Sequence, residues 1–124
     1  SLGVAVVTPQ QAYTIGFTPV SATTYDKTVS FTAPSDGYIY GTSTINIGGN
    51  VGDAGFPVTC INKVIINGTE YQGDQTIHTM VNYGIQSVLR NASCTVTSRF
   101  IAGTTGSAFP TCSQIVTSIF IPNP

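Results

Sequence analysis

Short runs of alternating apolar and polar residues, separated by turn residues, dominate the sequence. The clearest run covers residues 28–40 and reads TVSFTAPSDGYIY. Side chains two positions apart in a strand point to one face, so this pattern predicts a strand, a corner and a second strand. In the corner, Pro34 favours an extended residue before it. Asp36 is expected to bond to its own local backbone, and Gly37 to supply a positive φ for the return.

No segment longer than about eight residues shows the 3.6-residue apolar period of a helix. The chain of 124 residues is therefore predicted to be one all-β domain that covers residues 1–124. Its turn spacing is typical of an antiparallel jelly-roll β-sandwich of about eight to ten short strands. Residues 1–20 are expected to connect this domain to a preceding shaft or anchor region.

Two patterns in the middle of the chain predict local structure. The pair Asn67-Gly68 lies between two β-rich runs, and such a pair is the strongest short hairpin signal that a sequence offers. Residues 76–82 alternate in the manner of a strand, which Tyr83 and Gly84 are expected to break.

Two segments nearer the ends complete the predicted organisation. Residues 20–27 are mostly polar and are expected to form a loop. Residues 114–122 are expected to form the last strand, with Ile115, Ile119 and Ile121 as the candidates for its inward face.

The low charge of the chain limits its partners. Only 7% of the residues are charged, against roughly 25% in an ordinary soluble domain. Four Lys and Arg against five Asp and Glu leave no basic patch for phosphates, so nucleic acid is not an expected partner. No apolar run approaches the roughly 18 residues of a membrane span, and no membrane insertion is expected. A surface of hydroxyl and amide groups suits a durable exterior protein, or one that buries surface against its own copies.

Catalytic and metal chemistry find little support in the sequence. His78 is the one histidine and is expected to be an ordinary strand-face residue, although three copies in a symmetric trimer could meet on the axis and hold an ion. The carboxylates are scattered across turns, so paired-acid chemistry has no support. Cys60, Cys94 and Cys112 lack zinc-site spacing and are expected to include buried thiols, with any disulfide left open. The sequence predicts no enzyme, no metal site and no cofactor.

Several loops combine an aromatic ring with amide or carboxylate groups, which is a common pattern for gripping sugars. Loops on a rigid scaffold are where such sites usually lie. The alternative for each loop is an ordinary solvated turn. The candidate binding residues are Asn50, Asp53 and Phe56, then Tyr71 with Asp74, and Asn82 with Tyr83.

Four segments carry a resemblance to a known family: FTAPSDGYIYG, VIINGTE, IQSVLRNASCTVTSRF and VTSIFIPNP. They resemble the C-terminal head domains of tailed-bacteriophage receptor-binding and tail-fibre proteins, over roughly residues 28–122. In those heads a TAPSDGYV corner is followed by an NG hairpin and by a final strand that ends in FIP. The Lys-Lys-Gly-Asp turn that is common in the family is missing, because residues 90–93 read RNAS.

The resemblance implies a small jelly roll, similar to the tumour-necrosis-factor-like trimers, that binds structures on the host surface. Receptor-contacting residues vary within the family, so none is carried over. What the resemblance implies for single residues is a scaffold role for Pro34, Asp36, Gly37, Asn67 and Gly68.

We therefore expect a non-enzymatic receptor-binding head at the tip of a virion tail fibre. It is expected to recognise a host surface glycan or protein during adsorption, as a homotrimer. Two alternatives stay open: a structural virion or appendage subunit that serves assembly only, and a secreted bacterial carbohydrate-binding or adhesin module. The aromatic residues expected at the trimer interface are Tyr13, Tyr38, Tyr40 and Phe120.

Overall fold

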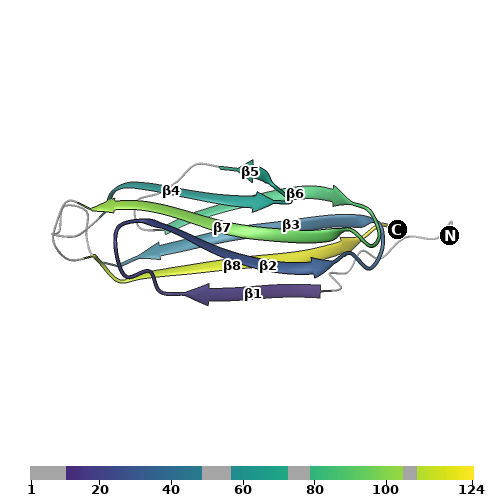
Figure 1. Ribbon diagram of the computed structural model, residues 1–124, viewed down its shortest axis with the longest axis horizontal. Coiled ribbons are helices and arrows are strands. Elements are labelled where there is room, and N and C mark those ends of the chain that lie inside the picture. The colour runs from purple at the N-terminus through teal and green to yellow at the C-terminus, as the bar shows by residue number, and fades with distance from the viewer. Residues whose placement is uncertain (1–10, 49–56, 73–78, 105–108) are drawn as a thin grey trace.

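In the part of the chain that the structure describes, eight antiparallel strands form two four-stranded sheets that pack face to face (Figure 1). A computed structural model describes residues 11–48, 57–72, 79–104 and 109–124. The β1 sheet contains, in spatial order, β1 (Gln11–Phe17), β8 (Cys112–Pro122), β3 (Gly37–Ile47) and β6 (Thr79–Val88). The β2 sheet contains, in spatial order, β2 (Thr24–Thr32), β7 (Ser93–Thr104), β4 (Pro57–Ile66) and β5 (Thr69–Tyr71). Within these residues, no helix is long and apolar enough to cross a membrane.

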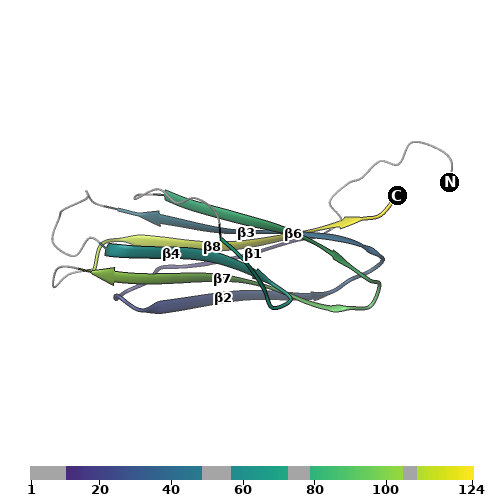
Figure 2. The same ribbon diagram turned by 90° about the horizontal axis from the view of Figure 1, so that it is seen from above.

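The pairing of the strands is that of a jelly roll. β1 pairs with β8, β2 with β7, β3 with β6 and β4 with β5. The chain crosses from one sheet to the other after almost every strand, and Figure 2 shows the resulting two layers from above. The prediction of an all-β antiparallel jelly-roll sandwich is confirmed. Most strands have nine to twelve residues, so they are longer than expected.

The core lies between the two sheets and is divided in two. One apolar cluster contains Phe31, Ile39 and Phe120, and the other contains Ile45, Met80 and Phe100. The Phe31 and Phe120 rings meet edge to face with centroids 6.2 Å apart, a favourable arrangement for aromatic pairs. Phe120 is therefore a core residue, and its prediction as an interface residue is wrong.

The corner at residues 33–37 is present, but two of its residues act differently from the prediction. Asp36 Oδ1 accepts a hydrogen bond from the Arg90 backbone N–H at 2.7 Å, so its carboxylate connects two loops instead of bonding locally. Gly37 does not have a positive φ. It is needed for close approach, because a Cβ at this position would overlap the Ile121 carbonyl oxygen and lie 2.8 Å from Phe120 Cζ.

The predicted Asn67-Gly68 hairpin is confirmed. The two residues connect β4 to β5 and have φ angles of 48° and 85°. Two consecutive positive φ angles are what a two-residue type I′ turn requires. The Asn67 side chain also accepts a hydrogen bond from the Thr95 backbone N–H at 2.9 Å, so the turn is anchored to the neighbouring strand.

The predicted break at Tyr83 and Gly84 is wrong, because β6 continues through both residues to Val88. Gly84 faces the other sheet, where the Tyr71 ring lies against it: a Cβ on Gly84 would be 2.5 Å from Tyr71 Cδ2. This glycine makes room for a ring inside a strand, which is a known role for glycine in sheets.

The inward face of β8 is the opposite of the predicted one. Val116 and Phe120 are buried, whereas Ile115, Ile119 and Ile121 are half-exposed and face outward. Apolar residues occur on both faces of this strand, so the alternating pattern alone could not decide which face points inward.

The polar segment at residues 20–27 is a loop only at its start, because β2 begins at Thr24. Asp26 pairs with Arg99 of β7 in the strand register, and the two side chains form an ion pair on the solvent side. Polar residues suit this strand because it is the edge of its sheet and its outer face meets water.

Candidate functional site

The outer face of the β1 sheet carries a cluster of apolar side chains. Residues directly opposite in an antiparallel pair share a face, and the register places Ile85, Tyr40 and Ile119 in one row across β6, β3 and β8. Val81 and Ile115 flank Thr44 in a second row. We call this cluster the apolar patch. The apolar patch consists of Tyr40, Val81, Tyr83, Ile85, Ile115 and Ile119.

The members of the apolar patch on β6 are the most exposed. Val81 is 52%, Tyr83 62% and Ile85 54% exposed. The Tyr40 and Tyr83 rings lie 5.9 Å apart between centroids, which joins β3 and β6 into one continuous surface. Contiguous exposed apolar surface is unusual on a soluble monomer and typically marks an interaction site.

No charged residue interrupts this outer face. None of the four strands of the β1 sheet contains Asp, Glu, Lys or Arg. The polar positions beside the apolar patch carry hydroxyl or amide groups, as at Thr42, Thr44 and Asn46. Covering such a face desolvates no ionised group, so the large cost of burying a charge does not arise.

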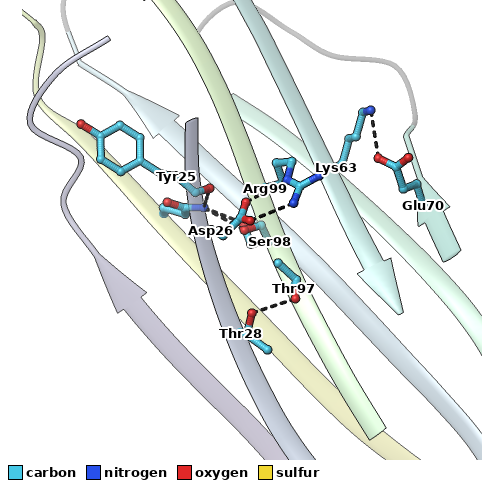
Figure 3. A network of polar contacts seen from close by, with 9 residues as sticks. Tyr25, Asp26, Thr28, Lys63, Glu70, Thr97, Ser98 and Arg99 are labelled. Atoms are coloured by element: carbon cyan, nitrogen blue, oxygen red, sulfur yellow. Dashed lines mark hydrogen bonds and ion pairs between the residues drawn. The ribbon is translucent and has the colours of Figure 1, made fainter. Parts of the chain in front are cut away.

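The outer face of the β2 sheet is built in the opposite way (Figure 3). Arg99 donates two hydrogen bonds of 2.9 Å to the Asp26 carboxylate. Lys63 of β4 forms an ion pair with Glu70 of β5 at 3.0 Å. These polar groups remain partly exposed to water, and exposed pairs of this kind contribute little to stability.

The three predicted sugar-binding residues that the structure describes do not gather into one site. Asn50, Asp53, Phe56 and Asp74 lie outside the described residues. The Tyr71 ring packs inward over Gly84, and its hydroxyl donates to the Ile85 carbonyl at 3.4 Å. Asn82 is 1% exposed inside the sandwich, whereas Tyr83 is on the outer face. A binding role for the candidate residues stays a prediction, and among those that the structure describes Tyr83 is the one with an exposed ring.

A belt of buried polar side chains crosses the core and separates its two apolar clusters. We call it the polar belt. Its members are Ser43, Asn62, Asn82, Ser98 and Gln114. The Ser43 hydroxyl donates to Asn62 Oδ1 at 2.5 Å. The Asn62 amide donates to the Ser43 and Met80 carbonyls at 2.9 and 3.1 Å. Buried polar groups need such partners.

The polar belt connects the two sheets, and the sequence pattern did not predict it. Gln114 Nε2 on β8 donates to the Ser98 hydroxyl on β7 at 3.0 Å. Each member occupies an inward position of its strand, as Ser98 does between Val96 and Phe100. A serine or asparagine in a strand is normally taken as an outward residue, so pattern analysis misses it.

The cysteines give no sign of a reactive site. Cys94 and Cys112 are buried thiols, and Cys60 is half-buried beside the second apolar cluster. Burial raises the pKa of all three thiols, and that of Cys112 rises to about 11, with the neighbouring Cys60 adding to the effect. High thiol pKa values oppose nucleophilic chemistry at neutral pH. His78 lies outside the described residues, and within them no three His, Cys, Asp or Glu side chains gather as a metal site.

No family model matches this chain, and no curated protein matches it.

Proposed function

We propose that this domain is a non-enzymatic receptor-binding head at the tip of a bacteriophage tail fibre. It attaches the virion to a glycan or protein on the host surface and works as a homotrimer. The observation that carries the proposal is the apolar patch, which lies on the β1 sheet alone while the described charged strand residues are all on the β2 sheet.

The apolar patch supports assembly from identical copies. Specific interfaces bury roughly 800 Å² on each partner and have a core depleted in charge. The outer face of the β1 sheet supplies a charge-free surface, with the exposed side chains of Val81, Tyr83 and Ile85 along its β6 edge. Closed rings of identical subunits are the usual way to cover one such face on every copy. The number three comes from the resemblance to phage head domains.

Recognition is supported by what assembly leaves uncovered. If copies meet through the β1 sheet, the loops at the ends of the sandwich and the outer face of the β2 sheet still face the surroundings. Loops on a rigid framework are common positions for binding residues. An assembly-only structural subunit would use the apolar patch in the same way, so binding must be measured separately from assembly.

The test has two independent measurements on the purified chain. Light scattering should give three times the 12.9 kDa of one chain. Labelled protein should then bind a subset of a panel of bacterial cells, and unlabelled protein should compete with it. A trimer that binds no cell type or arrayed glycan would favour the assembly role. A strict monomer at high concentration would overturn the trimeric head.

A further inference from the structure

A small hollow lies at the end of the sandwich where the chain finishes, next to the apolar patch along β3 and β6. It is lined by Asp36, Tyr38, Ser87, Leu89 and Asn123, among others, and has a volume of about 190 Å³. Its walls come from three separate segments: the corner before β3, the end of β6 and the residues after β8. This end carries the C label in Figure 1.

Asp36 holds the three segments together. Its Oδ1 accepts from the Arg90 N–H at 2.7 Å, and its backbone carbonyl accepts from the Asn123 N–H at 3.0 Å. The register places Tyr38 directly opposite Ser87, on the same face of the β1 sheet. The walls are thus fixed before any ligand arrives, which lowers the entropic cost of binding.

The lining offers two kinds of surface side by side. Tyr38 and Leu89 are 45% and 73% exposed, so a ring and a branched aliphatic group are available for apolar contact. Asp36 contributes a carboxylate, Ser87 a hydroxyl and Asn123 an amide. Together these groups can accept from and donate to several hydroxyls at once.

We propose that this hollow binds one pyranose ring of a neutral saccharide. A sugar ring has an apolar C–H face that suits the Tyr38 ring, and a rim of hydroxyls that suits the carboxylate and amide. Asp36 is the one charged residue of the lining, and its negative charge disfavours sialic acids, uronic acids and phosphates. A volume of about 190 Å³ is below the roughly 300–1,000 Å³ of sites for drug-sized ligands, so one ring or the end of a glycan fits.

The proposal deepens the recognition function by naming its ligand class, and rests on that function for the source of the sugar. The test is titration of the isotope-labelled chain with glucose, galactose, rhamnose and N-acetylglucosamine, followed by NMR. At least one sugar should shift the amide signals of residues 36–38, 87–89 and 123, with affinity on the order of millimolar, as expected for so small a ligand. N-acetylneuraminic acid should cause no such shift.

Variants separate binding from folding. Tyr38→Ala should weaken binding by about tenfold or more, whereas Tyr38→Phe should retain it, because the ring supplies the contact. Asp36→Asn keeps an acceptor for the Arg90 N–H but loses the charge, and should weaken binding by about tenfold. Asp26→Asn removes a carboxylate from the outer face of the β2 sheet and is the matched control, expected to bind normally.

The outcomes distinguish this proposal from the proposed function. Shifts at other residues, an absence of shifts with every sugar, or equal binding by Tyr38→Ala and the parent chain would overturn the sugar site. A chain that attaches to cells but shows any of these results keeps its recognition role with a different ligand. A chain that binds sugar in the hollow but no cell type keeps the site and loses the recognition role.

Discussion

The two sheets of this sandwich have the same number of strands and the same antiparallel pairing, yet their outer faces differ in kind. The β2 sheet carries five charged residues on its strands, and the β1 sheet carries none. Four of the five lie on the outer face, namely Asp26, Lys63, Glu70 and Arg99. The fifth, Lys27, is paired with the inward Ser98 and places its ammonium group over the Phe17 ring of β1. The inner faces of both sheets share one core, made of the two apolar clusters and the polar belt, so folding alone does not demand this difference. A face without charge is what a sheet needs when another surface is to cover it.

The strongest test of this comparison places the same charge on each face. Ile85→Lys puts an ammonium group in the apolar patch, where assembly would bury it without a partner, and the association constant should fall at least about a hundredfold, or roughly 3 kcal/mol. Thr95→Lys places the same side chain on an exposed position of the β2 sheet and should leave the association constant unchanged. Light scattering over a dilution series measures both. Equal association of the two variants would show that the faces do not differ in function.

The buried thiols of the two sheets give a second contrast. On β8, burial and the neighbouring Cys60 raise the pKa of Cys112 to about 11. On β7, burial also raises the pKa of Cys94, but hydrogen bonds with Asn67 and Ala33 oppose the rise. Cys94 should therefore ionise at lower pH than Cys112. Ultraviolet thiolate absorbance of single-cysteine variants during a pH titration measures this order, and the reverse order would contradict it.

Cys112 should also make stability depend on pH. The folded protein holds the Cys112 proton more tightly than the unfolded chain, whose thiol has an ordinary pKa of 9.0. Its contribution is therefore complete below pH 9.0 and declines as the pH rises toward about 11. Urea unfolding of the parent chain and Cys112→Ser, compared across this pH range, should show a steeper decline in the parent, because Cys60 and Cys94 remain in the variant.

A fourth prediction concerns the inner faces of the two sheets. Gly41 and Gly84 are paired on β3 and β6, and side chains of the β2 sheet fill the space above them. Gly84→Ala would bring a methyl group against the Tyr71 ring and should cost about 1–3 kcal/mol of unfolding free energy. Chemical denaturation measures the loss. Gly16→Ala is the control, because its Cβ would have no neighbour closer than 3.5 Å.

The smallest effect is expected on the charged face. Asp26 and Arg99 form a well-aligned ion pair, but their side chains are 41% and 36% exposed. A double-mutant cycle with Asp26→Asn and Arg99→Gln should give a coupling of about 0.2–1 kcal/mol that decreases with added salt. A coupling several times larger would mean that this face contributes more to stability than surface ion pairs normally do.

Local patterns predicted the parts of the fold that local chemistry determines. Asn67 and Gly68 form their hairpin because a type I′ turn needs two positive φ angles, which these residues adopt easily. The charge-free strands of the β1 sheet are also visible in the sequence, as is the all-β class.

Contacts between distant residues decided what the sequence could not predict. Ile115 and Val116 are both strongly apolar, and it is the contacts of β8 with distant residues, such as that of Phe120 with Phe31, that accompany the burial of Val116. In the sequence, Gly84 resembles a strand break. In the structure it lies within β6, and the Tyr71 ring fills the space that a side chain at position 84 would need. The apolar patch depends on which face of β8 points inward, so neither it nor the hollow beside Asp36 could be assembled from sequence alone.

The pairing of β1 with β8 has a consequence for how the protein folds during its synthesis. As the ribosome makes the chain from its amino end, β1 emerges early, but β8 separates it from β3 in the finished sheet. Until residues 112–122 leave the exit tunnel, neither β1 nor β3 has its central neighbour. The β1 sheet therefore cannot form strand by strand during translation. Its pairing can be completed only after β8 has been synthesised and inserts between β1 and β3.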